Sequence, residues 1–200
     1  DKQLSCINNA DCVELYETLK QRYLPSTSAG YMTRIKSMFQ YAFDNGKIKI
    51  SPTNQIKINK GSVKVEYLSN SDIYKIKTID LRDYPKLDKV RDLLLFQCGT
   101  GVAYADLILF DSTKIENING LNVYTNNRQK TKVEYTCVVM NDAMNVLDKY
   151  NGSLPIISNQ NYNKYLKELQ KLAKIETNIT THLLRKTSAH KLLNNGVRLE

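Results

Sequence analysis

The sequence predicts an α+β fold that is mainly helical and carries one small, antiparallel, three-stranded sheet. Apolar residues recur at helical spacing near both ends of the 200-residue chain. Between these ends, apolar and polar side chains alternate from Val133 to Val139, as in a half-buried strand. The dipeptide Asn119-Gly120 adds a hairpin signal ahead of that strand.

Two domains are expected, joined by a linker. Residues 1–50 are expected to form a small helical domain, and residues 67–200 a larger second domain. Residues 51–66 mix Pro, Asn, Gly and Ser with lysines and show no sustained period. This segment is therefore interpreted as the linker.

The first domain is expected to contain two helices. An amphipathic pattern over residues 26–48 places five side chains on one helical face: Tyr31, Ile35, Met38, Phe39 and Ala42. Asn45-Gly46 ends this helix, and apolar spacing over residues 13–19 indicates a helix before it. Three aromatic residues of this domain are interpreted as core rather than base-stacking residues: Tyr31, Tyr41 and Phe43.

The second domain is expected to open with helices over residues 72–80, 85–98 and 103–110. Ser69 or Ser71 caps the first, and Pro85 begins the second. The meander follows, with strands over residues 114–118, 121–125 and 132–140.

The last quarter of the chain returns to helices. One begins at Asn141, and another begins at Asn159 or Asn161. The last covers residues 182–193, with Thr181 as its cap and Asn195-Gly196 as its stop.

The charge of the chain points towards a polyanionic partner. The formal net charge is +9, and Lys plus Arg outnumber Asp plus Glu by 9 to 5 in residues 1–62 and by 13 to 7 in residues 113–200. Residues 63–112 are nearly neutral, with 7 against 8. Basic ends of this kind are typical of nucleic-acid binding, although a generic lysine-rich surface is the alternative.

Other compositional signals exclude several classes of protein. No apolar run approaches the roughly 20 residues that a membrane helix needs, and residues 1–12 have no signal-peptide character, which favours a cytoplasmic protein. The four cysteines show no C-x-x-C spacing, which indicates neither a zinc site nor a disulfide framework: Cys6, Cys12, Cys98 and Cys137. We expect them to be buried, reduced thiols.

The decapeptide THLLRKTSAH, residues 181–190, holds both histidines of the chain. His182 and Arg185 are three residues apart, so they share a face in the first turn of the predicted helix. Free backbone N–H groups, an arginine and an imidazole at a helix start suit a phosphate. The alternative is a capped helix in which Arg185 pairs with a surface carboxylate.

Several segments, which follow one another along the chain as they do in the family, resemble the tyrosine recombinases, also called phage integrases, which mobile elements carry. Residues 181–200 resemble the H-x-L-R-H-T-x-A box, and residues 96–110 resemble the first box, T-G-x-R-x-x-E-L. Residues 126–140 resemble the hairpin with the catalytic lysine. Residues 31–58 and 65–76 resemble the end of the helical core-binding domain and the start of the catalytic domain.

This resemblance implies roles for particular residues. Arg185 and His182 match the arginine and histidine of the second box, and Lys130 matches the hairpin lysine, with Lys132 as a rival. Asp106 matches the acidic residue of the first box, which supports the site from behind, and Lys186 stands where the family has His or Lys. Asp106 and Lys130 also have simpler interpretations: Asp106 merely caps a helix or forms a salt bridge, and Lys130 is one of several solvated hairpin lysines.

Two departures from the family pattern stand out. Ala103 replaces the arginine of the first box, which leaves Arg128, Lys186 or Lys191 as candidates for the missing positive charge. None of the 13 tyrosines follows the arginine box, so no residue matches the nucleophile. The chain is therefore expected to be a fragment that ends before the nucleophilic tyrosine and does not cleave DNA by itself.

The resemblance implies a site-specific DNA recombinase that forms a 3′-phosphotyrosyl link and needs neither metal nor cofactor. Double-stranded DNA is the expected partner, with dimers or tetramers on DNA for the full-length protein. The alternative is a DNA-binding protein without chemistry, such as a decayed recombinase. A helical interaction protein unrelated to DNA is a further alternative.

Overall fold

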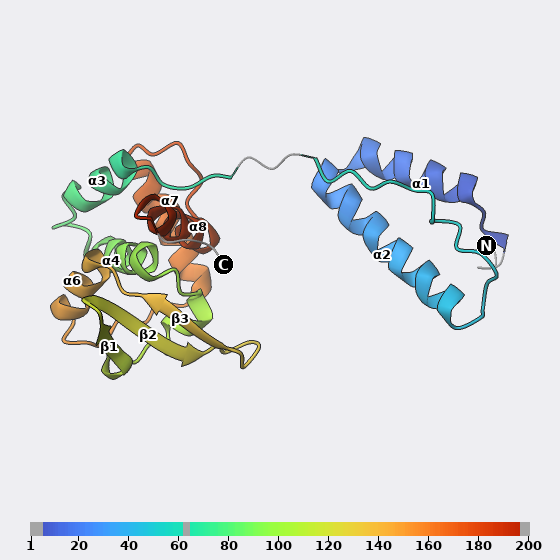
Figure 1. Cartoon of the computed structure of the whole chain (residues 1–200). Coiled ribbons are helices and arrows are strands. Elements are labelled where there is room, and N and C mark those ends of the chain that lie inside the picture. Colours follow the sequence, from blue (N-terminus) through green and yellow to red (C-terminus); the bar gives the residue numbers. More distant parts are fainter. Residues whose placement is uncertain (1–5, 62–64, 197–200) are drawn as a thin grey trace. The chain divides into compact units, whose positions relative to one another are not determined.

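The structure is a computed structural model that describes residues 6–61 and 65–196 (Figure 1). The chain divides into two compact units, Asp1–Lys64 and Val65–Glu200. Parts of the predictions lie outside the described residues: 1–5 of the first domain, 62–64 of the linker and 197–200 of the second domain.

The first unit contains two helices, α1 (Asn9–Arg22) and α2 (Pro25–Asp44). Asn8 caps α1 in a capping box with Asp11, and Pro25 begins α2. Between the helices lies a small core of buried residues: Cys12, Tyr16, Met32, Phe39 and Ile56.

Part of the predicted linker belongs to this first unit. The Ile56 side chain is buried in its core, and the Lys36 ammonium donates to the Ile56 carbonyl at 3.2 Å. The Asn59 backbone N–H donates to the Tyr16 hydroxyl at 3.2 Å. Irregular backbone can pack in this way without any periodic sequence signal.

The prediction that three aromatic residues of α2 belong to the core was wrong. Tyr31, Tyr41 and Phe43 are all exposed, Tyr41 to 70%. Among the described residues of this unit, α1 and the segment after α2 pack against one face of α2, which leaves the opposite face exposed. Tyr31 instead lies beside Tyr23, with 5.2 Å between ring centroids.

The second unit is mainly helical, with one antiparallel sheet of strand order β1-β2-β3, as predicted. Its elements follow in chain order: α3 (Asn70–Thr78), α4 (Pro85–Thr100), α5 (Tyr104–Leu107), β1 (Ile115–Ile118), β2 (Leu121–Asn127), β3 (Glu134–Val138), α6 (Asn141–Lys149), α7 (Asn159–Leu172) and α8 (Thr181–Asn194). Asn119 and Gly120 both have positive φ, +51° and +82°, in the turn between β1 and β2.

Helix α4 is the centre of the second unit, as Figure 1 shows. It contacts α6, α7 and α8, and its Leu94, Phe96 and Cys98 are fully buried. Gly99 allows α6 to approach closely, because a Cβ there would lie 2.9 Å from the Ala143 Cβ. The core therefore holds α8, the helix of the histidine and arginine, against α4.

Several predicted details needed correction. Thr180, not Thr181, caps α8, and Ser158, rather than an asparagine, caps α7. Helix α5 is only one turn long, so the prediction of a helix over residues 103–110 was too long. Cys6 is exposed and Cys137 only partly buried, whereas Cys12 and Cys98 are buried as expected.

Among the described residues, no helix has both the length and the hydropathy to cross a bilayer.

Candidate functional site

The start of α8 presents His182 and Arg185 together. The Thr180 hydroxyl accepts from the Leu183 backbone N–H at 3.2 Å, so the N–H groups of Thr181 and His182 have no intrahelical partner. Leu183 and Leu184 are buried and fix this turn in the core. His182 is exposed and Arg185 is partly buried on the neighbouring surface.

The Arg185 guanidinium has no carboxylate partner in the part of the chain that the structure describes. This observation disfavours the alternative in which Arg185 pairs with a surface carboxylate. A partly buried guanidinium beside free helix N–H groups favours binding of an anion. Phosphate fits best, because the planar guanidinium donates two parallel hydrogen bonds to it.

The two lysines of α8 differ in whether they form an ion pair. Lys191 pairs with Asp142 of α6 at 3.5 Å, which occupies its charge. Lys186 is partly buried and forms no ion pair with the described residues. Of the two, Lys186 is the one whose charge is available to an anion.

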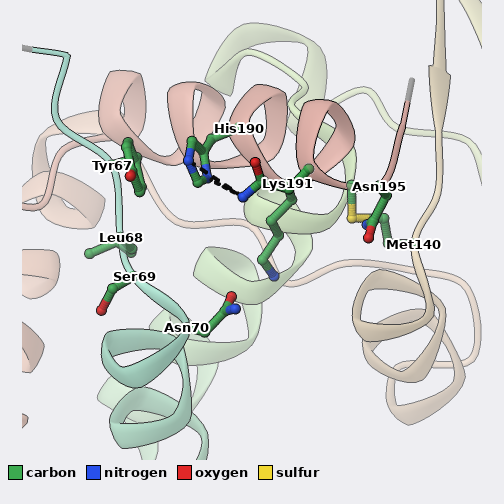
Figure 2. Close-up of a pocket in the computed structure, with 9 residues that line it drawn as sticks. Tyr67, Leu68, Ser69, Asn70, Met140, His190, Lys191 and Asn195 are labelled. Atoms are coloured by element: carbon green, nitrogen blue, oxygen red, sulfur yellow. Dashed lines mark hydrogen bonds between the residues drawn. The ribbon is translucent and has the colours of Figure 1, made fainter. Parts of the chain in front are cut away.

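His190, the second histidine of the chain, packs against an aromatic ring. The His190 ring stacks on Tyr67, with 3.5 Å between centroids, beside a pocket of about 360 Å³ (Figure 2). Next to it, the Leu68 backbone N–H donates to the Thr187 hydroxyl at 3.0 Å. The start of the second unit is thus anchored on α8, and neither His182 nor Arg185 lines this pocket.

Lys130 lies at the exposed tip between β2 and β3. Two backbone hydrogen bonds close this tip, from Arg128 N–H to the Val133 carbonyl and from Lys132 N–H to the Arg128 carbonyl, both at 2.9 Å. Lys132 is also exposed and has a φ of +58°. Both lysines are therefore open to solvent at the tip.

Asp106 of α5 holds the base of this tip. Its side chain is only 6% exposed, and it accepts the Gln129 backbone N–H at 2.8 Å. The Arg128 guanidinium lies 3.7 Å from the same carboxylate and 4.7 Å from the centre of the Tyr135 ring. Asp106 thus forms the salt bridge that the simpler interpretation allowed, but it does so from a buried position and also accepts a backbone N–H of the hairpin.

Tyr135 is a member of this cluster that the sequence did not indicate. Burial raises the pKa of its phenol, and the charge of Asp106 adds to the effect, so the ring stays neutral. Alternation along β3 predicts only that Tyr135 and Cys137 face the same side. No sequence signal pairs Tyr135 with Arg128.

The first box touches α8 through a glycine. Gly101 has a φ of +70°, and a Cβ there would lie 3.0 Å from the Ser188 hydroxyl. Ser188 follows Arg185 by three residues, so Gly101 fits against the same helix. Ala103 precedes α5, and its methyl group cannot donate to an anion.

The predicted site residues therefore fall into two groups. His182 and Arg185 share the start of α8, whereas Asp106 and Arg128 support the hairpin of Lys130. Among the described residues, no hydrogen bond or ion pair joins Lys130 to His182 or Arg185. In the same described ranges, no three His, Cys, Asp or Glu side chains gather into a possible metal site.

Comparison with solved structures identifies the fold. The chain resembles lambda integrase, solved as a dimer bound to a COC′ core site, with a TM-score of 0.72 and 15% identity over 98% of this chain and 74% of that one. The chain has the fold of the DNA integrases. It also resembles the Tn1549 transposon integrase bound to circular intermediate DNA, with a TM-score of 0.66 and 14% identity over 98% of this chain and 76% of that one.

A third neighbour widens this group. The XerH site-specific recombinase, in a post-cleavage complex with palindromic difH substrate, matches with a TM-score of 0.72 and 14% identity, over 96% of this chain and 63% of that one. By sequence, no protein-family model and no curated protein matches the chain. At these identities, the likeness establishes the fold.

Proposed function

We propose that this chain is part of a site-specific DNA recombinase of the tyrosine recombinase family, which cuts and rejoins DNA through a 3′-phosphotyrosyl intermediate. The observation that carries the proposal is Arg185, partly buried at the start of α8 without a carboxylate partner among the described residues. The chain shares its fold with integrases and recombinases whose structures were solved on DNA. The nucleophile is assigned to no residue of this chain.

Three side chains act on one phosphate in this proposal. Arg185 donates to the two nonbridging oxygens, where negative charge grows in the pentacoordinate transition state. His182 donates to the same phosphate and exchanges the proton of the attacking tyrosine. Lys130 gives a proton to the departing 5′-oxygen, which is otherwise a strongly basic leaving group.

Asp106 and Lys186 have supporting roles. Asp106 holds the hairpin from behind through the Gln129 N–H, and Lys186 adds positive charge next to Arg185. Because the bond energy is stored in the phosphotyrosyl link, the reaction needs neither metal nor cofactor. Double-stranded DNA is the partner, bound by the two basic ends of the chain, and the full-length protein works as a dimer or tetramer on DNA.

The second candidate function is a DNA-binding protein without chemistry. Ala103 favours it, because removal of one preorganised donor costs about 2.7–4 kcal/mol of transition-state stabilisation. DNA binding alone cannot separate the two candidates, so binding and chemistry need separate measurements.

Salt dependence tests the shared part of both candidates. Affinity for a duplex, selected by the chain from a random-sequence pool, is measured by fluorescence anisotropy between 50 and 200 mM salt. If 6–10 phosphates are contacted, affinity falls about 10³–10⁵-fold over that range, and Arg185→Ala reduces the slope by about one phosphate. No measurable binding of any duplex at 50 mM salt would instead support an interaction protein unrelated to DNA.

Cleavage with a supplied nucleophile tests the chemistry. Hydroperoxide attacks phosphorus, the bond to the 5′-oxygen breaks, and that oxygen takes a proton. A Cys6→Ser background prevents the exposed thiol from consuming peroxide. The proposal expects strand cleavage at one position that Arg185→Ala abolishes, and a defect of Lys130→Ala that a 5′-sulfur leaving group removes, because a thiolate departs without a proton. If the chain binds the duplex but peroxide produces no cleavage, the second candidate function, a DNA-binding protein without chemistry, is supported instead.

A further inference from the structure

We propose that Arg128 is a positioning residue: by pairing with the buried Asp106, it fixes the hairpin tip that carries Lys130. This inference rests on the proposed function, because it assigns Arg128 a role in the step that Lys130 performs. It also decides which role Arg128 has in a chain without the first-box arginine.

The pairing anchors the tip immediately before Lys130. A carboxylate as buried as Asp106 requires donors, since burial of an unpaired charge is costly. The Gln129 N–H donates to it at 2.8 Å, and the Arg128 guanidinium forms an ion pair with it at 3.7 Å. These residues directly precede Lys130, so the carboxylate fixes the backbone from which the lysine extends.

The guanidinium is also held from a second side. It lies 4.7 Å from the centre of the Tyr135 ring on β3, a favourable distance for a cation over an aromatic face. Its own backbone closes the tip through hydrogen bonds to Val133 and Lys132. Arg128 therefore joins α5, β3 and the tip at one point.

This geometry disfavours the other role considered for Arg128, direct binding of phosphate in place of the missing arginine. Turning the guanidinium towards DNA would leave Asp106 with one neutral donor and would give up the contact with the Tyr135 ring. The loss falls on a buried carboxylate, where it is most costly. Arg128 thus acts on the reaction through Lys130.

Leaving-group dependence distinguishes the two roles. In the peroxide assay, Arg128→Gln is expected to slow cleavage of the normal duplex about 10–100-fold, because small displacements of a catalytic group cost this much. The same variant should cleave the 5′-sulfur duplex within about twofold of the wild-type rate, since that step needs no Lys130. Combined with Lys130→Ala, Arg128→Gln should add nothing further.

A conservative variant and a second substitution complete the test. Arg128→Lys keeps the charge near Asp106 and should recover part of the rate on the normal duplex. If Arg128→Gln does not fold, Asp106→Asn combined with Arg128→Gln removes the unpaired buried charge while keeping an acceptor for Gln129. This double variant should show the same leaving-group-dependent defect.

Two results would overturn the inference. Equal slowing of both duplexes by Arg128→Gln would place Arg128 on the phosphate itself, and an unchanged rate on both would remove it from the reaction. Lys130→Ala reports separately on the proposed function: if it slows both duplexes equally, the proton-donor role of Lys130 fails, whatever Arg128 does.

Discussion

The two groups of site residues differ in how the fold supports them. The start of α8 lies on the core, with Leu183 and Leu184 buried beneath His182 and Arg185. The tip between β2 and β3 is exposed and is held at its base by the buried Asp106. Helix packing thus positions the proposed phosphate-binding groups, whereas one buried carboxylate positions the proposed proton donor.

This difference separates stability from function. Changes under α8 act on the core of the whole second unit, because α8 packs on α4. Changes at the hairpin tip remove few buried contacts and therefore affect mainly the position of Lys130. The two regions can be distinguished by measuring unfolding and DNA chemistry on the same variants.

The largest expected effect on stability comes from Leu184→Ala. Leu184 is fully buried next to Arg185, so truncation should lower the free energy of unfolding by about 2–5 kcal/mol. The matched control is Val133→Ala at the hairpin tip, which is 61% exposed and should change stability by no more than about 0.5 kcal/mol. Urea denaturation measures both. Similar values for the two variants would contradict the comparison.

Gly101→Ala sharpens the comparison at the contact of the first box with α8. The positive φ alone should cost about 1–2 kcal/mol, and the approach to Ser188 should add about 1 kcal/mol. Gly120→Ala has a similar φ of +82° but nothing within 4 Å of the new Cβ, so it isolates the backbone strain. If thermal unfolding shows no difference between the two variants, the contact with α8 contributes nothing.

A smaller effect on stability is expected from an ion-pair network around Asp88, in the first turn of α4. Burial acts to raise the pKa of Asp88, but Lys149 at 2.8 Å and Arg91 outweigh it, so the pKa lies below its ordinary value. The resulting stabilisation, under about 1 kcal/mol, is present above the unfolded-state pKa of about 3.9 and is lost as pH falls through the folded-state pKa.

Asp88→Asn tests this sign. The variant should be less stable than the wild type at pH 7, and the gap should narrow in urea titrations as the pH falls through the lowered pKa of Asp88. Asp83→Asn, which removes an exposed carboxylate without an ion pair in the described residues, serves as the control. A gap that widens in acid would mean that the network does not lower the pKa of Asp88.

The sequence predicted elements that depend on local chemistry. Asn119-Gly120 marks its turn because both residues adopt positive φ, and Pro85 marks a helix start because its ring suits the first helical position. The caps of α7 and α8 were misplaced because neighbouring residues of similar capping ability compete, as Thr180 and Thr181 do. Which one caps depends on where the preceding chain turns.

Tertiary contacts could not be predicted in the same way. The packing of Ile56 on α1 and α2 has no periodic signal, and the pairing of Asp106 with Arg128 joins residues 22 positions apart in the chain. The spacing of His182 and Arg185 at a predicted helix start indicated a phosphate site, and the resemblance to tyrosine recombinases added Lys130. Their arrangement around a phosphate stays a prediction.

Phosphate neutralisation tests that arrangement most directly. Methylphosphonates, which lack the charge, replace each backbone phosphate of the selected duplex in turn, and affinity is measured for wild type, Lys130→Ala, His182→Ala and Arg185→Ala. We expect one position where neutralisation weakens wild-type binding about 10–100-fold and weakens binding of each variant far less. If Lys130→Ala stays fully sensitive there, or its sensitivity is lost at another phosphate, the three residues do not share one phosphate.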